Sequence, residues 1–278
     1  MVKVSVRRSV IVVGITIILA GFPLAVFANH SWNGFHWARI NNPFTVKLGN
    51  NLSGQWLSDP QDGSNHLSRA SLDWNRSTVL DTTIVTGSSS PRTCRAVAGT
   101  VQVCNAAYGN TGWLGVAQVS VNGTHITQAT VKLNDTYFKP GAIYYTSAWR
   151  EMVACQEIGH TFGLNHQDTN FNNTNLGTCM DYTNDPTGTA GTNGTLSNIS
   201  PNQHDYDELT TIYSHSDTTT TLAAAANMPP AMSEIDLSGP AQWGRVIQGS
   251  REAGSTIHEL DFGGGNKVFT FVTWAKRN

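Results

Sequence analysis

Apolar and polar residues alternate over residues 42–48, which is the pattern of a β-strand with one buried face. Phe44, Val46 and Leu48 fall on one side of this run, and polar residues fall between them. Residues two apart share a face of a strand, so this alternation predicts a half-buried strand. Three further short β-rich runs, separated by Gly, Ser and Pro turn signals, occupy residues 79–85, 99–104 and 112–121.

A longer alternating run covers residues 125–135. Its apolar face carries Ala129, Val131 and Leu133, and its polar face carries Gln128, Thr130 and Lys132. The apolar face is predicted to enter the core. The polar face is predicted to meet solvent or a ligand, because a polar row along a strand has little reason to be buried without partners.

Two helices are expected in the first two thirds of the chain. The first is predicted by apolar or small residues at helical spacing, Leu67, Ala70, Ser71 and Trp74. The second begins at about Thr146, where the pattern becomes helical again. Gly163 offers a left-handed stop for it, since glycine adopts positive φ without steric cost.

A third helix is predicted within residues 200–213. Ser200 is its expected N-cap, with Pro201 at the first helical position and Gln203 three residues after the cap. Its apolar stripe consists of Leu209, Ile212 and Tyr213. Caps and stripe agree, so the segment is expected to be helical.

The N-terminal segment has the features of a secretory signal. Lys3, Arg7 and Arg8 precede an apolar run over residues 10–27, and Ala28 follows. A basic start, an apolar stretch and a small residue predict cleavage near Ala28 and a secreted protein. A membrane anchor that is never cut is the alternative, because about 18 residues is the lower limit for a spanning helix.

The rest of the chain suggests one main domain followed by a tail. The expected division is a signal peptide (1–28), a main domain (29–215), a low-complexity linker (216–232) and a small β-rich extension (233–278). The extension has two β-like runs, residues 243–249 and 267–275, around a glycine-rich turn. Such a hairpin must pack on something, because an isolated hairpin is marginal in water.

Composition and charge narrow the class of protein. Of 278 residues, 39% are hydrophobic, which is enough for one domain with a core. Only 13% are charged and the formal net charge is −2, so the chain has neither a basic footprint nor an acidic tail. These values exclude nucleic acid as a leading partner.

Four cysteines allow two disulfides in an oxidising compartment. Proximity in sequence suggests Cys94 with Cys104, which leaves Cys155 with Cys179. Three pairings are possible in principle.

Residues 155–168 carry the strongest candidate chemistry. Gln156 and His160 are four residues apart, so they share one helix face, with Glu157 beside them. After the turn at Gly163, His166 can reach the same point from outside the helix. Three donors around one point, next to a carboxylate, form an open metal site of the kind that binds catalytic zinc. A zinc-bound water has a pKa near ~7, and Glu157 would accept its proton as a general base.

These residues, with Met180 in the later Cys-Met-Asp-Tyr, resemble the metzincin clan of zinc endopeptidases. The clan pattern is His-Glu-x-x-His-x-x-Gly-x-x-His followed by a Met-turn. Over residues 37–213 the order of strands and helices is most similar to the matrixin branch. The resemblance implies an α+β catalytic domain: a twisted mixed sheet, an active-site helix and a C-terminal helix, here with a small β-hairpin extension. It also implies that residues 125–135 form the substrate-binding edge strand.

The same resemblance suggests roles for two further residues. Met180 would form a hydrophobic floor beneath the metal without binding it. Tyr182 matches the Met-x-Tyr spacing of astacin-like and serralysin-like metzincins, in which the tyrosine binds zinc or steadies the oxyanion. Matrixins usually lack this tyrosine.

The chain departs from the clan pattern at Gln156, which stands where the first histidine ligand is expected. An amide oxygen is a neutral, hard donor and zinc prefers imidazole or thiolate, so zinc affinity should fall. The third ligand is then Gln156 itself, Asp168, Tyr182 or a second water. The remaining possibility is that no zinc binds and the chain is a pseudoenzyme.

The resulting hypothesis is a secreted, monomeric zinc endopeptidase that acts on protein or peptide substrates without stable membrane association. Its metal ligands would be Gln156, His160 and His166, and its catalytic residues Glu157 and Tyr182. The alternative is a non-catalytic secreted protein that uses the same groove to bind peptides. Sequence spacing predicts no second metal site among the other histidines: His30, His36, His66, His125, His204, His215 and His258.

Overall fold

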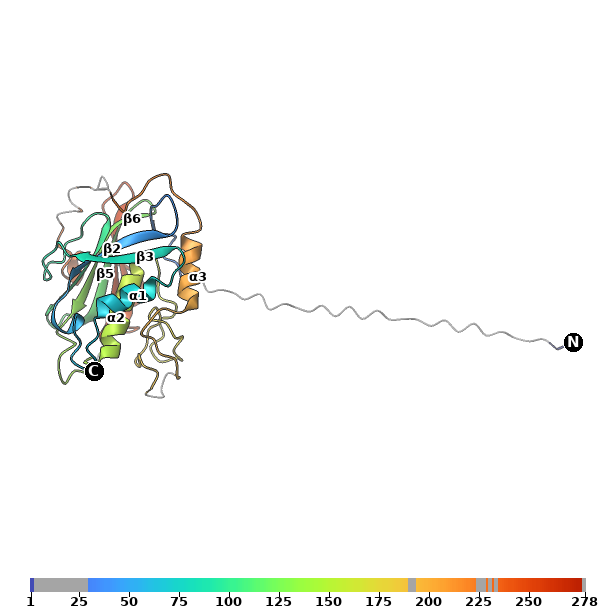
Figure 1. The fold of residues 1–278 in the computed structure, drawn as a ribbon, viewed down its shortest axis with the longest axis horizontal. Helices are drawn as coiled ribbons and strands as arrows, with labels where there is room; N and C mark the ends of the chain where they lie inside the picture. Colours follow the sequence, from blue (N-terminus) through green and yellow to red (C-terminus); the bar gives the residue numbers. More distant parts are fainter. Residues whose placement is uncertain (3–29, 190–193, 224–228, 230–231, 233–234, 277–278) are drawn as a thin grey trace.

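The computed structural model describes residues 1–2, 30–189, 194–223, 229, 232 and 235–276 (Figure 1). The predicted signal segment therefore lies outside the described residues, apart from its first two. None of the helices in the described ranges is long and apolar enough to cross a membrane.

The predicted α+β class is confirmed, because three α-helices accompany one large mixed sheet (Figure 1). The helices are α1 (His66–Trp74), α2 (Ser147–His160) and α3 (Gln203–Ile212). The strands are β1 (His36–Trp37), β2 (Phe44–Asn51), β3 (Leu80–Thr86), β4 (Thr100–Ala106), β5 (Trp113–Asn122), β6 (His125–Asn134), β7 (Arg245–Ser250), β8 (Ser255–Asp261) and β9 (Asn266–Trp274). Each strand and helix predicted from the alternation pattern thus has a counterpart. The hairpin predicted from residues 243–249 and 267–275 is wrong, because β8, which was not predicted from the sequence, lies between β7 and β9 and pairs with both.

Strands follow the order β3-β2-β4-β6-β5-β9-β8-β7, and β1 pairs with the start of β6. The half from β3 to β6 is parallel. From β5 onward every pairing is antiparallel. The sheet therefore joins the main domain and the C-terminal extension in one continuous ladder.

The expectation that residues 125–135 form an edge strand is wrong. This run is β6, and it lies between β4 and β5. The reason is topological, since β6 folds back antiparallel on β5 through a tight turn, and β5 then covers the side of β6 that faces away from β4. In turn β9 pairs with β5 over its whole length, so β5 is not an edge either.

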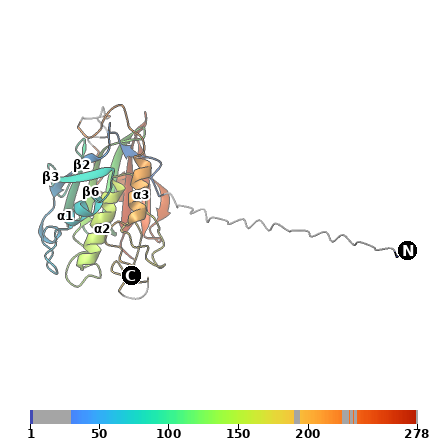
Figure 2. The ribbon, with the colours of Figure 1, turned by 45° about the vertical axis from the view of Figure 1, so that its right-hand side comes forward.

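All three helices lie on one side of the sheet (Figures 1 and 2). Helix α2 contacts α1 as well as β5, β6 and β9. Trp74 at the end of α1 is fully buried, packs edge-on against Phe162 and donates its indole N–H to the Cys155 carbonyl. Burial of side chains of this size contributes about 1.5–3 kcal/mol each, so this layer fixes α2 against the sheet.

Helix α3 starts two residues later than its sequence suggests. Asn202, not Ser200, is the N-cap, and it forms a capping box with Asp205. Ser200 with Gln203 and Asn202 with Asp205 both fit the pattern of a capping box. Asn202 prevails because its side chain accepts from the Asp205 amide while the Asp205 carboxylate accepts from the Asn202 amide.

The described start of the predicted linker binds the N-terminal part of the domain. Asp217 donates its backbone N–H to the Arg39 carbonyl, and Thr221 donates its own to the Ala38 carbonyl. These bonds hold the chain after α3 against the segment that follows β1. Both predicted disulfides, Cys94 with Cys104 and Cys155 with Cys179, are confirmed.

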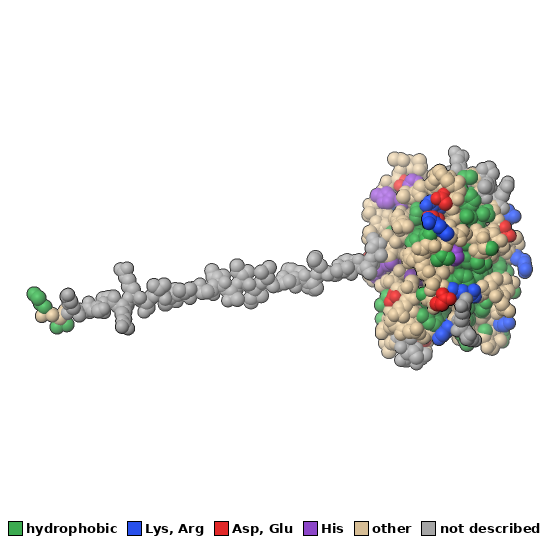
Figure 3. All heavy atoms as spheres, turned by 180° about the vertical axis from the view of Figure 1, so that it is seen from behind, with side chains coloured by type: hydrophobic (Ala, Val, Ile, Leu, Met, Phe, Trp, Pro, Cys, Tyr) green, Lys and Arg blue, Asp and Glu red, His purple; other side chains and the backbone are tan. Residues whose placement is uncertain are grey.

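On the face shown in Figure 3, Lys and Arg side chains lie among Asp and Glu side chains. This mixture agrees with the small net charge of the chain and gives that face no strong field of one sign.

Candidate active site

Helix α2 and the turn after it bring the two predicted histidine ligands together. Gly163 has φ +96°, and a Cβ there would lie 2.1 Å from the Phe35 carbonyl oxygen, so only glycine fits this turn. The chain reverses, and His160 Nδ1 donates to the Leu164 carbonyl at 2.9 Å. His166 then lies beside His160, as the spacing predicts.

The two histidines point their Nε2 atoms at each other over 3.2 Å. Their other ring nitrogens have fixed partners, since His160 Nδ1 bonds Leu164 and His166 Nδ1 lies 3.3 Å from Ser255 Oγ. A tetrahedral ion with Zn–N bonds of 2.0–2.1 Å separates two ligand nitrogens by about 3.3 Å. The pair therefore has the spacing and the outer hydrogen bonds of zinc ligands.

Burial keeps both imidazoles neutral, which is the form that binds a metal. It lowers the pKa of His160 to about 4. Burial and the neighbouring His160 lower the pKa of His166 well below its usual value. Without a metal, one N–H···N hydrogen bond between the rings satisfies both Nε2 atoms.

Glu157 is fully buried between α2 and β5. A Cβ on Gly115 would approach its Cγ and Oε1 to 2.7 Å, so this glycine makes room for the carboxyl group. Oε1 lies 2.6 Å from the Thr273 hydroxyl, and Oε2 has no hydrogen-bond partner within the described part of the chain. Burial raises the pKa of Glu157 to about 8, against the hydrogen bonds from Thr273 and the Ala117 backbone. In this conformation Glu157 holds a proton at neutral pH.

Gln156 uses its amide for contacts other than the histidines. Its Nε2 donates to the Cys179 carbonyl at 2.9 Å, and its Oε1 accepts from Thr273 Oγ1 at 2.7 Å. The hydroxyl of Thr273 therefore lies between Gln156 and Glu157. The Thr273 hydroxyl has one proton, which it can donate to Gln156 Oε1. The protonated Glu157 carboxyl can in turn donate its own proton to Thr273 Oγ1.

The two other candidates for the third ligand also have different partners. Tyr182 donates its hydroxyl to the Trp274 carbonyl at 2.6 Å, and its ring lies edge-on to His166. Asp168 accepts from the Asn170 backbone at 2.7 Å and from the Asn173 side chain, so it organises its own loop. The described conformation thus supplies two imidazole donors, and water or a rearranged side chain must complete the set.

Met180 packs against α2. It is fully buried, and a Cβ on Gly159 would approach its Sδ to 2.6 Å. This close approach holds residues 179–182 against α2. The Cys155–Cys179 disulfide ties the same two segments together.

The C-terminal strands cover the candidate site, and sequence reasoning missed the residues that do so. Phe271 stacks on His160 with ring centroids 4.4 Å apart. Thr273 contacts Glu157 and Gln156, and Ser255 contacts His166. These residues follow the motif by about a hundred positions, and no local pattern marks them. The sequence indicated only that the C-terminal extension had to pack on another part of the protein.

The chain matches no protein-family model, no curated protein and no solved structure. The site must therefore be judged on its own geometry.

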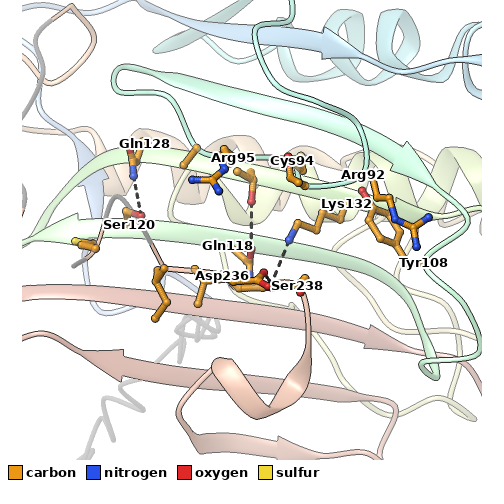
Figure 4. A pocket seen from close by; sticks show the side chains of 16 residues that line it. Arg92, Cys94, Arg95, Tyr108, Gln118, Ser120, Gln128, Lys132, Asp236 and Ser238 are labelled. Carbon is orange, nitrogen blue, oxygen red and sulfur yellow. Dashed lines mark hydrogen bonds between the residues drawn. The ribbon is translucent and has the colours of Figure 1, made fainter. Parts of the chain in front are cut away.

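Cavities lie near the covered site and on the far face of the sheet. A cavity of about 290 Å³ lies beside Tyr182, between the loop at Phe171 and residues 251–254. A larger one, about 460 Å³, lies on the opposite face of the sheet (Figure 4). Polar residues of β5 and β6 line it, namely Gln118, Ser120, Gln128, Thr130 and Lys132. The polar face predicted for β6 thus meets a cavity, although its side chains are buried.

The buried carboxyl makes the stability of the metal-free protein depend on pH. Glu157 ionises near pH 4.5 when unfolded and near pH 8 when folded. The stability that its proton contributes is present below pH 4.5 and is lost as the pH rises to 8. Glu157→Gln cannot ionise, so it should gain about 2–4 kcal/mol over the wild type between pH 5 and pH 8. Urea unfolding of both proteins with chelator measures this, and a pH-independent difference would contradict it.

Proposed function

We propose that the protein is a secreted zinc endopeptidase of metzincin type whose site is covered by its own C-terminal hairpin, which consists of β8 and β9. One observation carries the proposal. The Nε2 atoms of His160 and His166 converge to 3.2 Å on the same side of α2 as the buried carboxyl of Glu157. The two disulfides and the signal-like N-terminus support secretion.

The residues present fit a zinc ion, because both imidazoles are neutral and oriented by outer partners. Zinc, when bound, lowers the pKa of a water and polarises the peptide carbonyl. His160 and His166 would hold the ion. Glu157 would accept the proton of the attacking water and pass it to the leaving amine.

Glu157 acts as a base only after the hairpin moves. Its high pKa comes first from burial, so exposure to water returns the pKa toward 4.5 and leaves a carboxylate. Departure of β9 also removes Thr273 from Gln156 and Trp274 from Tyr182. Gln156 Oε1 would then be free to bind the ion, and Tyr182 would be free to steady the oxyanion.

The substrate is proposed to take the place of β9. Strand β9 pairs with β5 in the antiparallel sense from Trp113 to Asn122. An extended peptide can add to the same row of backbone groups once the hairpin leaves. This mode reads main-chain groups, so it fits protein or peptide substrates in general.

A histidine at position 156 should strengthen the site. Gln156→His replaces an amide donor by imidazole, which zinc prefers, so zinc affinity should rise by about tenfold or more. Competition with a chromophoric chelator measures the change. Gln156→Leu serves as the control and should not raise the affinity. Equal affinity of wild type and Gln156→His would show that residue 156 does not face the metal.

The closed site also fits a second candidate, a non-catalytic protein, which would bind peptides only after the same opening of the C-terminal strands. Gln156, Glu157 and His160 are at most 1% exposed and His166 is 7% exposed, so the described conformation admits no substrate. Zinc analysis joined to casein digestion with and without chelator separates the two functions. Chelator-sensitive cleavage selects the endopeptidase, and zinc-free protein without cleavage selects the binding protein.

A further inference from the structure

Three histidines that are far apart in sequence meet around one carboxylate oxygen. Asp217 Oδ1 lies 3.4 Å from His36 Nε2, 3.2 Å from His125 Nε2 and 3.7 Å from His215 Nε2. The Nε2 atoms of His36 and His215 are 3.1 Å apart. We call these four residues the histidine–aspartate cluster. None of them belongs to the motif around His160.

The fold builds this cluster from three segments. Strands β1 and β6 pair in parallel, with His36 opposite His125. The chain after α3 adds His215 and Asp217. Arg39 fixes Asp217, because its backbone N–H and its guanidinium both donate to Oδ2. The other oxygen, Oδ1, is left to face the histidines.

The distances within the cluster match those between ligands of one ion. A tetrahedral zinc ion with bonds of about 2.0–2.2 Å separates neighbouring ligand atoms by about 3.3 Å. The four contacts range from 3.1 to 3.7 Å. His36, His125 and Asp217 each offer an atom, all within 4.8 Å of one another. His215 Nε2 lies beside this trio, 3.1 Å from His36 Nε2 and 3.7 Å from Asp217 Oδ1.

Hydrogen bonds link the cluster in the metal-free protein. His36 Nδ1 donates to the Gly34 carbonyl at 2.7 Å, so the Nε2 of the neutral ring is a bare acceptor. His215 Nε2–H can donate to it at 3.1 Å, and His125 Nε2–H can donate to Asp217 Oδ1 at 3.2 Å. The His36 lone pair still faces Asp217 Oδ1 at 3.4 Å, and a cation between these two atoms would bind both.

The outer contacts are those of a metal site. The Gly34 carbonyl orients His36, and Arg39 orients Asp217, which is how outer partners hold metal ligands. The side chains of His125 and His215 are 36% and 49% exposed, so an ion can enter from solvent.

We propose that the histidine–aspartate cluster binds a divalent transition-metal ion, with zinc favoured by its three imidazoles and one carboxylate. His36, His125 and Asp217 would supply three ligands, and His215 or water would take the fourth position. The ion would clamp the chain after α3 to β1 and to the start of β6. This proposal is independent of the endopeptidase.

A second histidine group does not support the same inference. His30 and His204 lie near Asp205, but their rings stack at 19° with centroids 4.9 Å apart. Ring lone pairs lie in the ring planes, so stacked rings do not converge on one ion. Asp205 also commits Oδ2 to its capping box. This group provides a matched control.

The test is native mass spectrometry of the full chain loaded with zinc. His125→Ala/His215→Ala removes two half-exposed ligands without touching the buried Asp217–Arg39 pair. We expect this double variant to bind one zinc fewer than the wild type. His204→Ala is the control and should bind as many as the wild type. His166→Ala reports separately on the motif site.

The outcomes separate the two sites. Loss of one zinc in the double variant but not in His204→Ala supports the cluster, whatever His166→Ala does. Zinc should also raise the Tm of the wild type by more than that of the double variant, because binding to the folded state alone stabilises it. Equal zinc content in the wild type and the double variant would overturn the proposal.

Discussion

Glu157→Ala is expected to abolish peptide hydrolysis while leaving the zinc content near that of the wild type. A general base contributes about 10²–10⁴-fold to such a reaction, so the rate of casein cleavage should fall by about 10³-fold. Zinc should remain because the imidazoles of His160 and His166, not the carboxylate, hold it. The measurement is chelator-sensitive casein digestion together with zinc analysis of the same preparations.

Glu151→Ala provides the matched control for this experiment. Glu151 lies on the same helix but pairs with Arg69 at 2.6 Å, away from the histidines. Its loss should leave cleavage intact. If Glu157→Ala digests casein as fast as the wild type, the proposed base is wrong. If it also loses its zinc, the carboxylate has a role in binding the metal.

A cross-link between β5 and β9 is expected to switch the activity off. Gln118 lies directly opposite Thr270, and such residues have Cβ atoms about 4.5–5.5 Å apart, near the reach of a disulfide. In Gln118→Cys/Thr270→Cys the oxidised hairpin cannot leave β5. Cleavage should then fall to the level of Glu157→Ala and return on mild reduction.

The native disulfides do not interfere with this test, because all four native cysteines are at most 2% exposed. Thr270 suits the substitution, since its buried hydroxyl has no hydrogen-bond partner in the described part of the chain. Thr270→Cys alone, treated with the same reductant, is the control. Full activity of the oxidised double variant would show that the hairpin need not open.

Local patterns predicted the elements of this fold well. Alternation located β2 and β6, and helical spacing located α1 and α3. The cap of α3 was displaced by two residues because two overlapping segments offer similar capping chemistry. Where each strand lies in the sheet was not predictable in this way, since alternation shows that a strand has two faces but not which strands flank it.

The candidate site was predictable only where its residues are close in sequence. The spacing of His160, Gly163 and His166 encodes a helix, a turn and a return, and the structure brings the two rings together. The cover was not predictable, because Phe271 and Thr273 reach the site through pairing of strands distant in sequence. The same holds for the histidine–aspartate cluster, whose members meet only when β1, β6 and the end of α3 come together.

Zinc binding by the motif histidines is measured most directly once the second cluster is removed. In the His125→Ala/His215→Ala background, native mass spectrometry with zinc counts the ions held at the motif. The proposed site predicts one zinc per chain, and none after His166→Ala is added. A background protein that binds no zinc when it is offered, or one that keeps its zinc without His166, would contradict the endopeptidase.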